Sequence, residues 1–185
     1  MIYEKEAMKY KPDKIKYLFI AEAPPDADIE KGEEFRYFYF DNEAFKFDYL
    51  FKNIVEILFS VKYDKIDKKD LLVRLKSKGF FLIDAIHTPI KRGLSDKKRA
   101  ELINDDFPYL LEKLKKLTDK DTKIILIKKV VYNELNGRLR KLGFSIINTE
   151  MLDFPSHGNQ TKFKVKFRNL MEKEKYGERE VNDKK

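Results

Sequence analysis

The sequence contains no cysteine and only two histidines, His87 and His157. Without cysteine, the chain can form no disulfide, no zinc site built on thiolates and no iron–sulfur cluster held by cysteines. Two histidines are also too few for a histidine-rich metal site. We therefore expect the protein to hold no metal and to use no cofactor.

Long hydrophobic runs are absent as well. No stretch approaches the roughly 20 apolar residues that a membrane-spanning helix needs. The first six residues, Met1–Glu6, lack the basic and then apolar order of a secretory signal. These absences predict a soluble, cytoplasmic protein without a membrane partner, and we expect it to act as a monomer.

Positive charge is in excess over the 185 residues. Lysine and arginine number 40 against 32 aspartates and glutamates, which leaves a formal net charge of +8. That sign is the one expected of a protein that binds the phosphate backbone of a nucleic acid. The density of lysine and glutamate is equally typical of thermophile proteins, so the excess of positive charge is the stronger indication.

The chain alternates between apolar runs and amphipathic segments. Runs of β-forming residues predict four strands, at Tyr17–Ile20, Phe80–Ile86, Lys123–Val131 and Phe144–Ile147. Helical spacing of apolar residues, together with capping residues, predicts five helices. They are predicted to start near Asp48, at Asp67 or Asp70, at Ser95, at Asn133 and at Thr161. The helix from Ser95 is predicted to reach Leu117 with a break at Pro108, and the helix from Thr161 to end at Tyr176. Residues 1–14 are predicted to be a polar lead-in, and residues 177–185 a solvated tail.

This alternation predicts an α/β fold. Strands that alternate with helices are joined by right-handed crossovers into a parallel sheet that carries helices on both faces. We expect a three-layer αβα sandwich around a four-stranded parallel sheet. A chain of this length buries about 70% of its unfolded surface as one domain, so a single domain is expected over residues 1–185.

The first predicted strand runs into a proline-rich acidic loop, because two prolines prevent the strand from continuing. The loop begins with Ala21-Glu22-Ala23-Pro24-Pro25. In open α/β sheets, the loops at the carboxyl ends of the strands form the ligand crevice. We therefore expect Glu22, Asp26 and Asp28 to lie at such a crevice. The alternative is an acidic turn in solvent.

Polar residues also follow the second and fourth predicted strands. The second strand leads into Asp84 and His87, and the fourth leads into a loop with Ser156, His157, Asn159 and Gln160. The ends of parallel strands can meet at one edge of the sheet, so these side chains can converge with the acidic loop. Together with the aromatic segment at 35–40, they suit a planar hydrogen-bonding ligand such as a nucleobase.

Two of these motifs resemble the signatures of the uracil-DNA glycosylase superfamily. The acidic loop is similar to the Gly-Glu-Ala-Pro-Gly motif of its thermostable branch, with Ala21 and Pro25 in place of the two glycines. Phe154-Pro155-Ser156 aligns with the family's His-Pro-Ser motif, so that Phe154 stands at the histidine position. The thermostable branch holds an iron–sulfur cluster through four cysteines, so the resemblance implies a cluster-free relative.

The resemblance implies a DNA repair enzyme that binds single- or double-stranded DNA. Members of the family flip a damaged base, stack it on an aromatic ring and hydrolyse its N-glycosidic bond. Uracil is the default substrate. Asp84 stands at the position of a family asparagine. Ala23 occupies a place where some branches carry a catalytic aspartate or asparagine, which is a departure from the pattern.

The resemblance also implies roles for individual residues. The implied catalytic residues are Glu22, Asp84 and His157. The implied base-binding residues are Phe38 as the stacking ring, Tyr37, Ala21, Ala23 and Pro24. The implied nucleic-acid contacts are Pro155, Ser156, Gly158, Asn159 and Gln160 in a wedge loop, and Arg92. Further candidate phosphate contacts are Lys91, Lys162, Lys164, Lys166 and Arg168.

Each of these roles has a structural alternative. The aromatic side chains are equally suited to core packing, Asp84 to capping a turn, and the charged runs to a solvated face. At the level of function, Ala23 and Phe154 also fit a nucleic-acid-binding module that has lost catalysis. A binder of free nucleobases or nucleotides is the third hypothesis.

Overall fold

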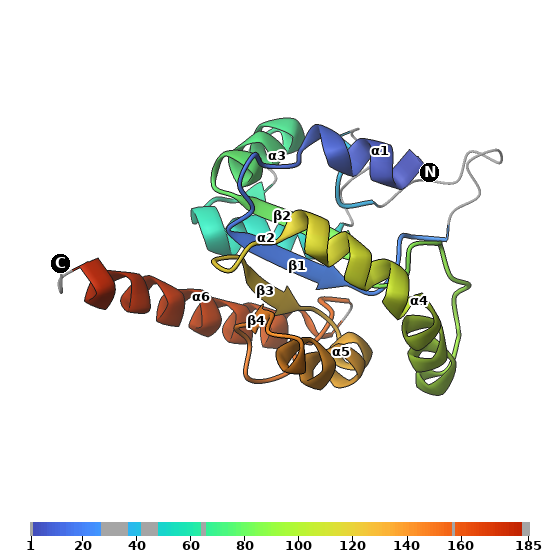
Figure 1. The fold of residues 1–185 in the computed structure, drawn as a ribbon. Coiled ribbons are helices and arrows are strands. Elements are labelled where there is room, and N and C mark those ends of the chain that lie inside the picture. The colour runs from blue at the N-terminus through green and yellow to red at the C-terminus, as the bar shows by residue number, and fades with distance from the viewer. Residues whose placement is uncertain (1, 27–36, 42–47, 64–65, 157, 183–185) are drawn as a thin grey trace.

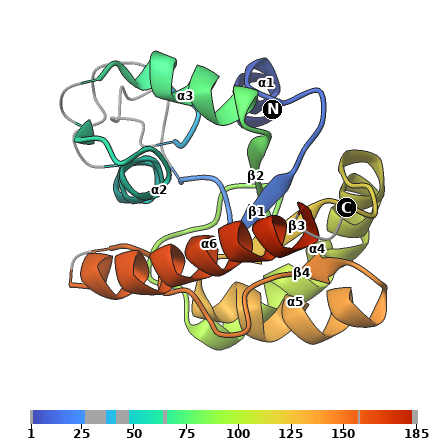
Figure 2. The same cartoon turned by 90° about the vertical axis from the view of Figure 1, so that its left-hand side faces the viewer.

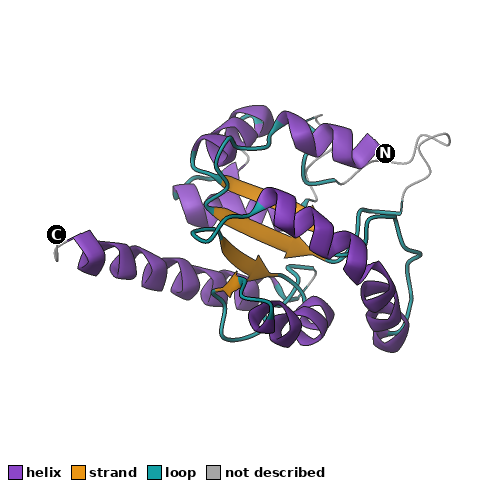
Figure 3. Cartoon of the chain, in the orientation of Figure 1, coloured by secondary structure: helices purple, strands orange, loops and turns teal. Residues whose placement is uncertain are grey.

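The computed structural model describes residues 2–26, 37–41, 48–63, 66–156 and 158–182, and for residues 175–182 it describes the backbone alone. The described chain has an α/β architecture with a four-stranded, all-parallel sheet and six helices. Helices lie on both sides of the sheet (Figures 1 and 3). The predicted fold class, a three-layer αβα sandwich around a parallel sheet, is therefore confirmed.

The sheet has the strand order β2-β1-β3-β4. Its strands are β1 (Tyr17–Ala21), β2 (Phe80–Asp84), β3 (Lys123–Leu126) and β4 (Ser145–Ile146). β1 lies between β2 and β3, and all five of its residues are buried, which suits its uninterrupted apolar sequence. The register pairs Ala21 with Asp84, so that the carboxyl ends of β1 and β2 lie level with each other.

The helices begin largely where capping residues predict. They are α1 (Ile2–Lys9), α2 (Tyr49–Phe59), α3 (Lys68–Ser77), α4 (Asp96–Leu117), α5 (Lys129–Lys141) and α6 (Gln160–Asn182). The side chains of Asp48, Asp67 and Ser95 each accept a hydrogen bond from a first-turn backbone N–H. α2 packs against α6, and α4 packs against α5 (Figure 2). No described helix is both long enough and apolar enough to cross a membrane.

The two ends of the chain are more helical than predicted. Residues 1–14, predicted to be a polar lead-in, contain α1, which buries Tyr3 and Ala7 in the core, and Tyr10, directly after the helix, is buried as well. Tyr3 and Ala7 are four positions apart, which places them on one face of the helix. At the other end, the backbone is helical through Asn182, so the predicted end of the last helix at Tyr176 is wrong. The solvation of the tail remains a prediction.

The predicted strand Lys123–Val131 is wrong in its second half. β3 ends at Leu126, the backbone turns at Lys128 with a φ of 84°, and α5 begins at Lys129 rather than at Asn133. The β-branched pair at 130 and 131 extends the apolar run of the strand in sequence. In the fold, however, Val131 belongs to the buried face of α5 together with Leu135 and Leu139, four and eight residues further on.

Helix α4 contains Pro108 but is not divided by it. The helix runs without interruption from Asp96 to Leu117, and Figure 1 shows that its axis changes direction along its length. A proline inside a helix removes one backbone hydrogen bond and kinks the helix. Buried side chains on both sides of the proline, among them Ile103 and Leu114, keep the two halves packed on the core. The predicted break is thus a bend.

The aromatic segment 37–41 is fixed to the outer edge of β2. The Tyr39 hydroxyl donates to the Leu82 carbonyl at 3.1 Å and accepts from the Leu82 N–H at 2.6 Å. β2 is an edge strand of the sheet, so these Leu82 groups have no strand partner on that side. The Lys68 ammonium, which forms a buried ion pair with Asp48 at 3.1 Å, also donates to the Tyr37 carbonyl. Two buried contacts therefore set the position of Tyr37 and its neighbours.

Replacing Tyr39 with phenylalanine tests this anchor. The change leaves the buried N–H and carbonyl of Leu82 without a partner, so we expect the free energy of unfolding to fall by about 2 kcal/mol. Urea denaturation of the purified variant measures this loss. Tyr132→Phe is the matched control, because the Tyr132 hydroxyl makes one exposed hydrogen bond to the Thr149 carbonyl. Equal losses in the two variants would show that the Tyr39 hydroxyl is not an anchor.

Candidate functional site

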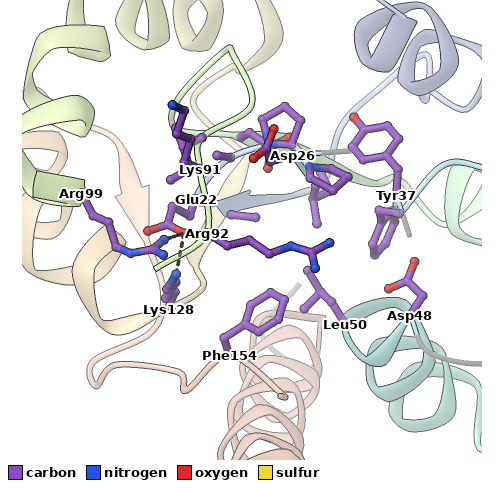
Figure 4. A pocket seen from close by; sticks show the side chains of 18 residues that line it. Glu22, Asp26, Tyr37, Asp48, Leu50, Lys91, Arg92, Arg99, Lys128 and Phe154 are labelled. Carbon is purple, nitrogen blue, oxygen red and sulfur yellow. Dashed lines mark hydrogen bonds and ion pairs between the residues drawn. The ribbon is translucent and has the colours of Figure 1, made fainter. Parts of the chain in front are cut away.

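A cavity of about 280 Å³ lies at the carboxyl ends of the central strands. We call it the first cavity. Its lining includes residues that follow β1, β2 and β3. β2 lies on one side of β1 and β3 on the other, so the first cavity lies at the point where the strand order changes direction. Ligand sites of open α/β sheets are found at this position. Figure 4 shows the side chains that surround the first cavity.

Most of the predicted site residues described by the structure line the first cavity. These are Ala21, Glu22, Ala23 and Pro24 after β1, Tyr37 and Phe38 in the aromatic segment, Asp84 at the end of β2, and Arg92. The lining also includes Asp26, Lys91 and Phe154, which the sequence analysis singled out. Four segments that are far apart in the sequence thus contribute to one cavity.

Glu22 is held by two cations. Its Oε2 atom accepts a hydrogen bond from Arg99 Nη1 at 2.6 Å and another from the ammonium of Lys128. The Glu22 and Arg99 side chains are only 11% and 15% exposed, so both charges are largely removed from water. The second oxygen, Oε1, is buried and has no hydrogen-bond partner in the described structure. Figure 4 shows both cations converging on this carboxylate.

Arg99 and Lys128 are functional candidates that the sequence analysis missed. Arg99 lies in the first turn of α4, where its Nε also donates to the Leu94 carbonyl at 2.9 Å. Lys128 lies in the turn directly after β3. A correct end for β3 would have identified Lys128, because polar residues after the other strands were already candidates. No comparable sequence signal marks Arg99.

Asp84 also contributes a carboxyl group to the first cavity, as do Asp26 and Asp48. The pKa of Asp84 is raised to about 7: burial is the main cause, the positive charge of Lys113 opposes the rise, and the negative charge of Glu22 adds to it. No described residue donates a hydrogen bond to the Asp84 carboxyl. At neutral pH this group therefore exists in both protonation states, so that it can either accept or donate a proton.

The backbone after β2 is held in place although the strand itself ends at Asp84. The N–H groups of Ala85 and Ile86 donate to the carbonyls of Ala21 and Glu22, both at 2.9 Å. Backbone hydrogen bonds to the chain after β1 thus continue as far as Ile86, where the sequence predicts the end of the strand. They also tie the end of β2 to the start of the acidic loop, which fixes Asp84 beside Glu22.

Phe38 and Tyr37 form an aromatic wall of the first cavity. Both side chains are 6% exposed, and the Phe38 ring packs edge-on against the core ring of Phe51 at a centroid distance of 5.1 Å. Burial, together with the charge of Asp84, raises the pKa of Tyr37, so its hydroxyl stays protonated. These rings pack in the core, as the structural alternative predicts, and they also line the first cavity. The stacking of a base on Phe38 remains a prediction.

None of the described residues of the predicted wedge loop, at 155, 156 and 158–160, lines the first cavity. Phe154, directly before this loop, does line it. Pro155 is buried, and Gln160 accepts a hydrogen bond from the buried Asn53 amide at 3.3 Å. His157 and Asp28 lie outside the described residues. The roles of Pro155, Ser156, Gly158, Asn159 and Gln160 as nucleic-acid contacts remain predictions.

Other predicted residues lie away from the first cavity. The His87 ring contacts Asp106 through Nδ1 at 2.6 Å and packs on Tyr109, and it does not line the first cavity. On α6, Lys164 pairs with Glu56 at 2.8 Å, and Lys166 pairs with Asp153 at 3.2 Å. These lysines serve as ion-pair partners on the surface of the fold.

Glu22→Gln tests the ion-pair network. The substitution leaves Arg99 and Lys128 close together without a counter-charge in a partly buried site, so we expect a loss of about 3 kcal/mol in unfolding free energy. Urea denaturation measures the loss. Glu101→Gln removes an exposed ion pair with Lys98 and should cost less than about 1 kcal/mol. A loss for Glu22→Gln no larger than that of the control would contradict a structural role.

Asp84→Asn tests the raised pKa of Asp84. A carboxyl group whose pKa rises from 3.8 in the unfolded chain to about 7 in the fold stabilises the protein below pH 4. That contribution is lost as the pH rises to 7, and we expect the variant to gain up to about 4 kcal/mol over the wild type across this interval. Urea denaturation of both proteins at several pH values measures the difference. A difference that does not change with pH would contradict the raised pKa.

Neither a comparison with protein-family models nor one with curated proteins found a match to the sequence. Among the described residues, no group of three or more histidine, aspartate or glutamate side chains is placed to hold a metal ion.

Proposed function

We propose that the protein is a DNA glycosylase-like hydrolase that removes a flipped, damaged base from DNA, with uracil as the default substrate. The observation that carries this proposal is the presence of Asp84, the Phe38–Tyr37 wall and the acidic loop around one cavity. An aromatic wall binds the face of a planar base, and a carboxyl group beside it can activate the water that attacks the sugar.

The size of the first cavity supports a small ligand. Pockets for drug-sized molecules are roughly 300 to 1,000 Å³, and the first cavity, at about 280 Å³, is slightly smaller than this range. Such a volume suits one planar ring more than a larger cofactor. A base that is flipped out of a DNA strand is a ligand of this kind.

Asp84 is the proposed general base. In the reaction, the bond between the base nitrogen and the sugar carbon C1′ breaks, and its electron pair leaves with the base. Water attacks C1′, and the Asp84 carboxylate takes a proton from this water. A pKa of about 7 provides the required carboxylate at neutral pH and lies close to the optimum for proton transfer.

Glu22 is the proposed positioning residue. Its carboxylate is neutralised by Arg99 and Lys128, so it is a poor candidate for the base that activates water. The ion pairs instead hold the acidic loop in the geometry that places Asp84 beside the aromatic wall. Lys91 and Arg92 are exposed, line the same cavity and are suited to binding phosphates or the charge of a leaving base.

A second candidate function is a nucleic-acid or nucleotide binder without catalysis. The engagement of Glu22 by two cations favours it, because a family-like catalytic role for this residue is then blocked. Ala23 also offers no functional side chain at its position. This candidate predicts salt-dependent binding that survives replacement of both carboxyl groups.

A base-release assay tests the proposed function. Oligonucleotides that contain uracil, hypoxanthine or xanthine are incubated with the protein, and abasic sites are cleaved by alkali and counted. We expect release from at least one substrate, and we expect Asp84→Asn to slow it by about 100-fold or more. Phe38→Ala should also slow release, whereas Glu101→Gln, on the exposed face of α4, should leave it unchanged.

Each failure in this assay has a distinct meaning. No release from any substrate by folded protein would contradict the proposed hydrolase, and salt-dependent binding in that case would favour the second candidate. Release that Asp84→Asn leaves unchanged would show that another group activates the water.

A further inference from the structure

A second cavity lies on the other side of Asp84. Its volume is about 220 Å³, and its lining comes from α1, the acidic loop, β2 and α4. It shares four lining residues with the first cavity, which are Pro24, Tyr37, Leu82 and Asp84. Asp84 and Tyr37 therefore form part of the wall between the two cavities. The proposed hydrolysis makes no use of this second cavity.

The second cavity has aromatic walls. The rings that line it are those of Tyr3, Tyr37, Phe81 and Tyr109, and Tyr3 packs edge-on against Tyr37 at a centroid distance of 4.8 Å. Two of the lining side chains, Met8 and Tyr109, are 51% and 43% exposed. Large apolar side chains are thus available to solvent at a cavity rather than closed into the core.

Two lysines stand beside these rings. Helix α4 contributes Tyr109, Lys113 and Lys116 to the lining, at positions i, i+4 and i+7, which is the spacing of one helix face. The Lys113 ammonium makes a loose ion pair with Glu4 at 3.4 Å. Lys116 is exposed, and no ion pair joins it to any residue of the described chain. One face of α4 therefore presents an aromatic ring next to two ammonium groups.

We propose that the second cavity is a binding site for a small aromatic anion, that is, a single ring with one carboxylate or phosphate group. The ring packs among Tyr3, Tyr37 and Tyr109, and the anionic group is held by Lys113 and Lys116. The two lysines supply the charge that complements the anion, and Glu4 gives up its loose pair with Lys113. The volume of about 220 Å³ limits the ligand to a single ring with short substituents.

The position of the site links it to the first cavity. The charge of Lys113 already acts on Asp84, because it lowers the pKa of that carboxyl against the effect of burial. The other charged or titratable groups that line the second cavity are Glu4, His87, Lys116 and the hydroxyls of Tyr3, Tyr37 and Tyr109. His87 is engaged by Asp106. An anion bound at Lys113 therefore lies close enough to change the pKa of Asp84. Its binding does not depend on the proposed hydrolysis.

Ligand titrations test the proposal without any activity assay. The probes are benzoate and phenyl phosphate, with benzyl alcohol as the neutral control, and binding is followed by calorimetry and by backbone amide shifts. We expect saturable binding of at least one anion, at least tenfold tighter than that of benzyl alcohol, with shifts at Tyr109 and Leu117. The double variant Lys113→Gln/Lys116→Gln should weaken it at least tenfold.

Two matched variants locate the ligand. Lys97 and Lys120 lie near the opposite ends of α4, in its first turn and beyond its last, and neither lines the second cavity, so Lys97→Gln/Lys120→Gln controls for the loss of two charges. Phe38→Ala, in the first cavity, should leave benzoate binding unchanged. Failure of both anions to bind would overturn the proposal. Equal weakening of binding in the two double variants would also overturn it, as would loss of binding in Phe38→Ala. These outcomes are independent of the result of the base-release assay.

Discussion

The pairing of Glu22 with Arg99 and Lys128 is the interaction on which the rest of the site depends. It joins three separate parts of the fold, namely the loop after β1, the first turn of α4 and the turn after β3. Because these charges are largely buried, they are far more costly to separate than surface ion pairs. The network closes one side of the first cavity and keeps the acidic loop against the end of β2. The backbone N–H groups of Ala85 and Ile86, which donate to the carbonyls of Ala21 and Glu22, fix Asp84 beside this network.

The two carboxyl groups have different environments, although they follow neighbouring, level strands. The Glu22 carboxylate accepts hydrogen bonds from Arg99 and Lys128. The Asp84 carboxyl, by contrast, shares the first cavity with the rings of Tyr37 and Phe38 and has a pKa of about 7. Environments that separate two nearby carboxyl groups in this way are typical of sites with acid and base chemistry. The position of Asp84 between two cavities adds a route by which a second ligand can act on the same group. The first cavity thus has the ion pairs of Glu22 on one side and the titratable carboxyl of Asp84 on the other.

The general fold and much of the site were predictable from the sequence, because local patterns determine them. The apolar run of β1, the prolines after it and the caps at Asp48 and Ser95 each act over a few residues. Lys128 was missed because Val130 and Val131 prolong the apolar run of β3, although tertiary packing makes them helical. Arg99 was missed because its partner Glu22 lies 77 residues away, and no local pattern indicates such a contact. The aromatic segment was recognised, but its attachment to Leu82 by the Tyr39 hydroxyl depends on the assembled sheet edge.

The central claim is that the first cavity binds a planar base between the Phe38–Tyr37 wall and Asp84. A crystal structure of the protein with saturating free uracil tests it most directly. The account predicts the uracil ring in the first cavity, against Phe38, with its N1 edge, which carries the sugar in DNA, facing the Asp84 carboxyl. Uracil bound only outside the first cavity, or a first cavity that stays without uracil at saturation, would contradict it.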